Sequence, residues 1–202
     1  MQWRRYDVGL PPVFSISVPV GFQREEEGTD APQTSSSFLG MPSSSRIPLK
    51  TQGTLAHFNG AIDRSAIQVI VAFIESRQLR PTFQQINDIS AYGSPEDVAL
   101  LILPRRGVRR LVSKSTEIAL PPRDTGTVRG TFVPPPRSYY EYAFSLAVED
   151  PEGSGGASEV DVRMSLAALR GRVYCAVVSA TPGAAVADAV ITDVASSFRL
   201  SK

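Results

Sequence analysis

Short runs of β-branched and aromatic residues, separated by polar or glycine-containing segments, fill the second half of the chain. Residues of these types favour strands over helices, and tight connections between them favour antiparallel pairing. The segment Leu169-Arg170-Gly171-Arg172 has the composition of a hairpin turn. We therefore expect an antiparallel meander, whose predicted strands cover residues 115–120, 128–133, 139–148, 160–169 and 172–179.

Three further strands are expected in the first half of the chain. Apolar and small polar residues alternate over 13–18, which indicates a strand with one face buried. Residues 54–58 and 66–73 are rich in β-branched or aromatic residues and predict a pair of strands. The turn between them is expected at Asn59-Gly60 and Asp63, since these residue types favour turns.

Two helices complete the predicted elements. Ser94, Pro95 and Asp97 form a helix start, because serine can cap, proline suits the first position and Asp97 completes a capping box. Pro104 cannot continue that helix. A second helix is expected from about 183 to 198 and should lie across one sheet face. Its apolar positions at helical spacing are Ala187, Val190, Ile191, Val194 and Phe198.

Length and composition point to one domain. The 202 residues are 42% apolar, which is enough for one substantial core. We expect an N-terminal arm over 1–12 and a single domain over 13–202. A long polar insertion is expected at about 21–52, where an acidic run at 25–27 and serine triplets at 35–37 and 43–45 occur.

The charge and the rare residue types exclude several classes of function. With 21 basic and 20 acidic residues, no overall field attracts nucleic acid or an anionic membrane. Cys175 is the only cysteine, so no intrachain disulfide forms, and we expect it to be a packed, inert residue. No apolar run is long enough for a membrane span. The N-terminus lacks the apolar core of an intact secretory signal, so we expect a cytosolic protein or a removed targeting peptide.

Six segments, taken in order, resemble one known family. They are Phe14 to Phe22, Ala66 to Phe73, Gly93 to Val98, Tyr139 to Tyr142, Leu169 to Tyr174 and Val194 to Phe198. This order is similar to that of the PsbP family, the lumenal extrinsic proteins of oxygenic photosynthesis. The resemblance implies an α+β fold, an α-β-α sandwich in which helices flank a mostly antiparallel central sheet. It also implies calcium as the one cofactor to consider, although no calcium-binding loop is evident in the sequence.

Two features depart from the family pattern. Family members of the oxygen-evolving complex carry a lysine-rich N-terminal extension, whereas about a dozen residues precede the first expected strand here. The insertion at 21–52 is also longer than the resemblance leads us to expect. Both features favour a divergent PsbP-like or PsbP-domain protein of the thylakoid lumen.

Two groups of residues are candidates for partner binding. Arg105, Arg106, Arg109 and Arg110 follow the first helix, and guanidinium groups pair well with carboxylates on a partner. The alternative for these four arginines is a solvated loop. Trp3, Arg4, Arg5 and Tyr6 in the arm are suited to anchoring a partner, or the arm packs on its own sheet. Among Tyr139, Tyr140 and Tyr142, alternation predicts one buried and one exposed face.

Metal and catalytic candidates are weaker. His57, the only histidine, lies in a predicted strand near Asn59 and Asp63, and His57 with Asp63 is a weak metal candidate beside the alternative of an ordinary strand histidine. The acidic residues at 25–27 and Asp30 lack the spacing of a calcium loop. No base accompanies the serine triplets, so we expect no catalytic residue.

The sequence thus predicts a non-enzymatic extrinsic protein of the chloroplast thylakoid lumen. The partner expected first is photosystem II with its oxygen-evolving complex, bound peripherally on the lumenal side without nucleic acid. One alternative is an assembly or auxiliary factor for photosystem I or a related thylakoid complex. Another is a Mog-type Ran-binding protein, since those proteins share the sandwich architecture. An enzyme would require a pocket in which acids with shifted pKa values converge.

Overall fold

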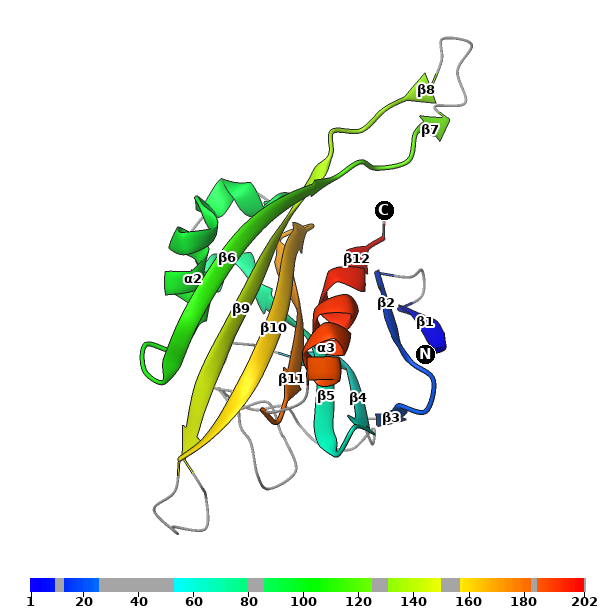
Figure 1. The fold of residues 1–202 in the computed structure, drawn as a ribbon. Coiled ribbons are helices and arrows are strands. Elements are labelled where there is room, and N and C mark those ends of the chain that lie inside the picture. Colours follow the sequence, from blue (N-terminus) through cyan, green and yellow to red (C-terminus); the bar gives the residue numbers. More distant parts are fainter. Residues whose placement is uncertain are drawn as a thin grey trace.

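A seven-stranded antiparallel sheet in the order β3-β4-β5-β11-β10-β9-β6 forms the centre of the molecule (Figure 1). The computed structural model describes residues 1–9, 13–25, 53–79, 86–124, 131–149, 157–182 and 185–201. The strands are β1 (Trp3–Val8), β2 (Phe14–Pro19), β3 (Gln23–Glu25), β4 (Gly53–Ile62), β5 (Ser65–Glu75), β6 (Val108–Ile118), β7 (Arg123–Asp124), β8 (Thr131–Phe132), β9 (Arg137–Glu149), β10 (Ala157–Leu169), β11 (Arg172–Ala180) and β12 (Arg199–Leu200). The helices are α1 (Ser76–Leu79), the 3₁₀ helix η1 (Ile89–Tyr92), α2 (Pro95–Ile102) and α3 (Ala185–Ser197).

Two tight hairpins set the register of the central strands. The predicted turn at Leu169 to Arg172 is confirmed, with Arg170 and Gly171 at φ 50° and 75° between β10 and β11. Positive φ at both central residues matches the right-handed twist of the flanking strands. The turn between β4 and β5 is at Asp63 and Arg64, which have φ values of 48° and 67°.

The predicted turn is therefore confirmed at Asp63 and wrong at Asn59-Gly60, because Asn59 and Gly60 lie inside β4. Gly60 is needed there for space. A Cβ at this position would lie 2.3 Å from a ring carbon of Phe22. The glycine thus serves the packing of an aromatic ring against the strand, a requirement that local composition does not reveal.

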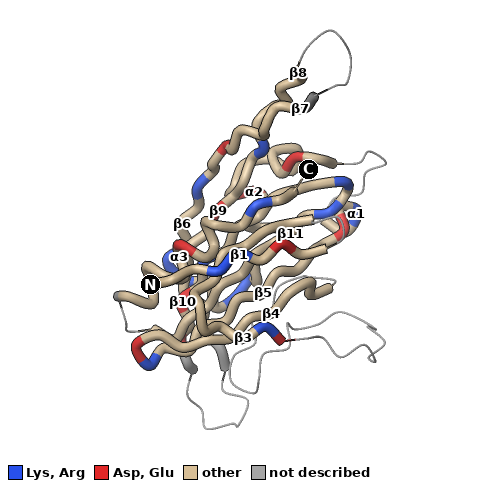
Figure 2. The backbone as a smooth tube through the Cα atoms, turned by 90° about the vertical axis from the view of Figure 1, so that its right-hand side faces the viewer, with Lys and Arg blue, Asp and Glu red and all other residues tan. Residues whose placement is uncertain are grey.

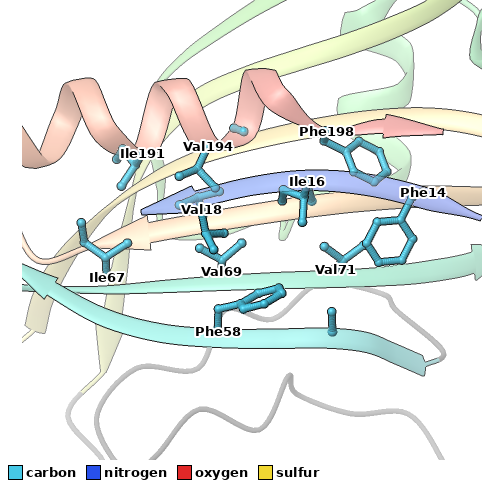
Figure 3. Close-up of a cluster of buried hydrophobic side chains, with 14 of the residues drawn as sticks. Phe14, Ile16, Val18, Phe58, Ile67, Val69, Val71, Ile191, Val194 and Phe198 are labelled. Atoms are coloured by element: carbon cyan, nitrogen blue, oxygen red, sulfur yellow. The ribbon is translucent and has the colours of Figure 1, made fainter. Parts of the chain in front are cut away.

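One face of the sheet is covered by helix α3 and strand β2 together (Figure 3). Strand β2 is the middle strand of a separate sheet, in the order β1-β2-β12. Its Phe14, Ile16 and Val18 are fully buried, as predicted for residues 13–18. They pack in one cluster with apolar residues of β4, β5 and α3, including Phe58, Val69, Ile191 and Val194, and with Phe198, which directly follows α3.

Helix α2 and the turn η1 cover the opposite face. Ser94 accepts a hydrogen bond from the Asp97 amide, and the Asp97 carboxylate accepts one from the Ser94 amide, so the predicted capping box is confirmed. Tyr140 donates to the Gly93 carbonyl at 2.6 Å, and Tyr142 donates to the Pro95 carbonyl at 2.7 Å. The helix start is thereby held to strand β9.

The predicted sandwich is thus present in a sheet-dominated form. Helices lie on both faces of the central antiparallel sheet, but a strand layer shares the α3 face with the helix. The predicted C-terminal helix is confirmed as Ala185–Ser197, and β12 follows it immediately. Most of the predicted insertion, residues 26–52, lies outside the described residues, while Gln23–Glu25 forms β3. Of the strand predicted over 128–133, residues 128–130 lie outside the described residues, and Thr131 and Phe132 form β8.

The prediction of an exposed tyrosine face on β9 is wrong. Tyr139, Tyr140 and Tyr142 are 1%, 4% and 2% exposed. Tyr139 packs in the cluster beneath α3, whereas Tyr140 and Tyr142 pack in the cluster beneath α2. A strand covered on both faces buries both sets of alternating side chains. These rings are therefore core residues and do not contribute a docking surface.

We predict that Phe198→Ala lowers the free energy of unfolding by about 3–5 kcal/mol, as expected for deletion of a buried ring. The Phe198 ring is fully buried, with its centroid 5.8 Å from that of Phe14 and 6.4 Å from that of Tyr139. Urea denaturation measures the loss. The control is Val186→Ala on α3, whose side chain is exposed and whose loss should stay within about 0.5 kcal/mol. Equal losses in the two variants would contradict this packing.

A second prediction concerns Asp88, the N-cap of η1. Its carboxylate accepts hydrogen bonds from the amides of Ser90 at 2.9 Å and Ser138 at 3.0 Å. Burial raises the pKa of Asp88, but the hydrogen bonds from Ser90 and Ser138 outweigh burial and hold the pKa below its usual value of 3.8. A carboxyl whose pKa is lowered on folding stabilises the fold above pH 3.8, and this contribution is lost as the pH falls through the lowered pKa.

Asp88→Asn keeps one acceptor oxygen and removes the other, so we expect a loss of about 1 kcal/mol at pH 7. The difference from the original protein should shrink as the pH falls below 4. Urea denaturation at a series of pH values measures both effects. Asp193→Asn, at an exposed position of α3, is the matched control. A deficit in Asp88→Asn that is independent of pH would show that its charge does not contribute.

Candidate docking surfaces

The N-terminal residues Trp3 to Tyr6 lie in a strand that pairs with β2. Tyr6 is half-buried, with its ring centroid 4.8 Å from that of Phe58 on β4. Arg5 forms an exposed ion pair with Asp7 at 3.2 Å. Trp3 and Arg4 are exposed. Of the four candidate residues, Tyr6 therefore contributes to the fold, and Trp3, Arg4 and Arg5 are accessible to a partner.

The second candidate surface, Arg105, Arg106, Arg109 and Arg110, lies beside and within strand β6. Arg105 and Arg106 are in the turn that follows α2, and Arg109 and Arg110 belong to β6 itself. The alternative of a post-helix loop therefore holds only for the first two. All four are exposed, and none makes a hydrogen bond or ion pair within the described part of the chain. We call these four residues the arginine cluster.

Elsewhere in the described residues, several arginines are engaged within the fold. Arg137 is 6% exposed and donates to the Leu200 carbonyl at 3.0 Å, which ties β9 to β12. Arg172 bonds to Glu75 at 2.8 Å and lies over the Phe73 ring. Arg163 pairs with Asp188 on α3. The charges of the arginine cluster serve no contact of the described fold, and four such residues lie within six positions of the chain.

The structure does not bring the two candidate surfaces together. Strand β6 ends the central sheet at one side, whereas β1 contacts β4 near the other side through Tyr6 and Phe58 (Figure 1). In Figure 2, basic and acidic positions alternate over several elements instead of forming one charged face. A partner that contacts both surfaces would have to reach across the sheet.

Nor does the structure join the two weak metal candidates. His57 is buried in the middle of β4, and its Nδ1 lies 2.5 Å from a carboxylate oxygen of Glu25 on β3. Asp63 lies six residues further on, in the turn. At the rise of a strand, this separation is about 20 Å. Among the described residues, no three His, Cys, Asp or Glu side chains gather into a metal-binding group.

The contact between His57 and Glu25 was missed by the sequence interpretation. Glu25 pairs directly with His57 across β3 and β4, and Asn59 also donates to the Glu25 carboxylate. Residues 26, 27 and 30, the other acidic candidates, lie outside the described residues. Strand β3 contains only Gln23–Glu25, and a pattern of three residues is too short to predict a strand from the sequence. The pairing of Glu25 with His57 therefore could not be predicted.

Side chains with shifted pKa values all have structural explanations. Hydrogen bonding from Ser113 lowers the pKa of Glu96, and hydrogen bonding from the Ser94 amide lowers that of Asp97. Both carboxylates are in the first turn of α2. Burial raises the pKa of Cys175 to about 12, so the thiol is a poor nucleophile, as predicted. The hydrogen bonds and the burial that cause these shifts belong to the start of α2 and to the core.

The chain matches no family model and no curated protein. It is similar to the solution structure of cyanobacterial PsbP (CyanoP) from Synechocystis sp. PCC 6803, with 15% sequence identity and a TM-score of 0.47. The match covers 98% of this chain and 92% of that chain. Separately, no helix within the described ranges is long and apolar enough to cross a membrane.

We predict that the double variant Arg105→Glu and Arg106→Glu changes the free energy of unfolding by less than about 0.5 kcal/mol, because these side chains have no partner among the described residues. Arg137→Ala should instead cost about 1–3 kcal/mol, since it leaves the buried Leu200 carbonyl without its donor. Urea denaturation compares them. A large loss in the double variant would assign the arginine cluster a structural role.

Proposed function

We propose that this protein is a non-enzymatic, PsbP-like extrinsic protein that binds peripherally to a photosynthetic membrane complex on the lumenal side. Photosystem II with its oxygen-evolving complex is the proposed partner. The observation that carries the proposal is the arginine cluster, which is exposed and unpaired within the described fold. Guanidinium groups of this kind suit docking to carboxylates on a protein surface.

The family-like residues support the proposal by their structural use. The segment from Gly93 to Val98 resembles the PsbP helix start. The carbonyl oxygens of Gly93 and Pro95 in this segment accept hydrogen bonds from Tyr140 and Tyr142, which belong to another family-like segment. Two separate parts of the resemblance therefore meet in space as one structural unit. Such a unit holds a fold together and carries no chemistry.

The proposal assigns no catalytic residue and no resident cofactor. The carboxylates whose pKa values are lowered, Asp88, Glu96 and Asp97, serve as helix caps or lie in the first turn of a helix. In this proposal, calcium acts on the partner's side of the contact, and the docked protein shields or stabilises the partner. The proposed location in the thylakoid lumen follows from the same resemblance.

Rebinding to thylakoid membranes stripped of extrinsic proteins tests the proposal. We expect the protein to rebind photosystem II in a salt-sensitive manner, since screening weakens exposed charge pairs. The double variant Arg105→Glu and Arg106→Glu should bind about tenfold more weakly. The charge-matched control is Arg24→Glu with Arg77→Glu, at exposed positions on β3 and α1.

Two outcomes would contradict the proposal. The first is an absence of rebinding to any photosystem complex. The second is an equal loss in the cluster variant and the control variant, which would assign the effect to net charge. Rebinding only to immature particles, or to photosystem I, would identify the protein as an assembly or auxiliary factor instead.

A further inference from the structure

Strand β6 leaves one long edge of the central sheet open. It is the last strand in the sheet order and pairs only with β9 among the described strands. The strand runs from Val108 to Ile118, and most of its side chains are exposed. Backbone amides and carbonyls on such an edge are available to pair with another extended chain.

The charges on β6 oppose pairing with a second copy of the chain. The strand carries three basic residues, Arg109, Arg110 and Lys114, and one acidic residue, Glu117. Lys114 lies 3.9 Å from a carboxylate oxygen of Glu141 on β9, so the unpaired basic charge is that of the two arginines. Like charges directly opposite each other destabilise a strand pair. The nearby Arg105 and Arg106 add to this repulsion. The same charges attract a segment rich in carboxylates, so complementarity favours an acidic partner.

A shallow groove next to the edge offers room for side chains of an added strand. It lies between β6 and α3, and apolar, basic and acidic side chains line it, including Val112, Lys114, Glu141, Ala143, Arg163 and Thr192. Its basic groups are paired, Lys114 with Glu141 at 3.9 Å and Arg163 with Asp188. Val112 is 63% exposed, and the neighbouring Leu111 is 44% exposed. An added strand would present alternate side chains to this groove.

A bulge limits where a strand can be added. The register of β6 against β9 shifts between Arg109 and Val112, and Arg110 has φ 54°. From Val112 to Ile118 the pairing with β9 is regular. Bulges bend the strand and interrupt its row of hydrogen-bonding groups. Pairing is therefore expected beyond the bulge, with the arginines beside one end of the added segment.

We propose that β6 binds an extended, acidic segment of a partner protein, which pairs with Val112–Ile118 as an eighth strand of the central sheet. The inference rests on the proposed function, which takes the arginine cluster as a docking surface. It adds the chemistry of the partner segment and the backbone contact by which that segment is held.

Binding of a synthetic peptide tests the proposal without a membrane. The probe is acetyl-Glu-Val-Glu-Val-Glu-Val-Glu-amide, with the lysine-for-glutamate peptide as its control, and titration calorimetry measures affinity for the full chain. We expect the acidic peptide to bind and the basic peptide not to bind. The double variant Arg106→Glu and Arg109→Glu should weaken binding at least tenfold, whereas Arg24→Glu with Arg77→Glu, at exposed positions on β3 and α1, should leave it unchanged.

Two N-methylated peptides separate strand addition from simple charge attraction. One carries N-methyl groups at the odd positions and the other at the even positions. In an added strand, one set of amides faces β6 and the other faces away. One peptide should therefore lose at least tenfold in affinity while the other binds nearly as before. Equal affinities, or no binding of the unmodified acidic peptide, would overturn the proposal.

The peptide experiment tests strand addition and the membrane experiment tests the proposed function, so either can fail without the other. Salt-sensitive rebinding to photosystem II without the N-methyl pattern would support the proposed function and overturn strand addition. Peptide binding with that pattern, but no rebinding to any thylakoid complex, would support an acidic strand partner and overturn the proposed function. Sedimentation of the protein alone provides a third check, because a dimer abolished by Val112→Pro would show that a second copy occupies the edge.

Discussion

The fold depends on the burial of both faces of the central strands. Every described residue of β11 after Arg172 is buried, and its neighbours β5 and β10 are also largely apolar. A sheet of this kind is stable only when both faces are covered. Helix α3 and strand β2 cover one face, and α2 with η1 covers the other. The covering elements come from both ends and the middle of the chain, so the core joins distant segments.

That coverage explains where two arginines are held within the fold. Arg137 and Arg172 lie where covering elements or neighbouring strands meet, and their guanidinium groups bond to a carbonyl and a carboxylate there. Arg109 and Arg110 lie in β6, the last strand of the sheet order (Figure 1), and Arg105 and Arg106 lie in the turn before it. The charge of the arginine cluster contributes no contact to the described fold. This surplus charge beside an open strand edge is the reason for placing the contact with a partner there.

Local signals predicted those elements that depend on a few neighbouring residues. The capping box at Ser94, the hairpin at Arg170-Gly171 and the apolar stripe of α3 were all predicted correctly, because short-range hydrogen bonds and periodicity determine them. The turn at Asn59-Gly60 was wrong because Phe22, distant in sequence, requires the space beside Gly60. The four arginines were found as a charge run, but the sequence did not reveal that two of them lie in an edge strand.

The sequence by itself determined the strand-rich fold class, the two main helix positions and the absence of an intrachain disulfide, because composition and local periodicity suffice for these properties. Only the tertiary structure decided which side chains are free. It buried Tyr139, Tyr140 and Tyr142, paired His57 with Glu25, and left β6 with β9 as its one neighbour among the described strands. The exposure of a side chain depends on which segments cover each face and edge of the sheet. Contacts between residues far apart in the chain determine which segments those are.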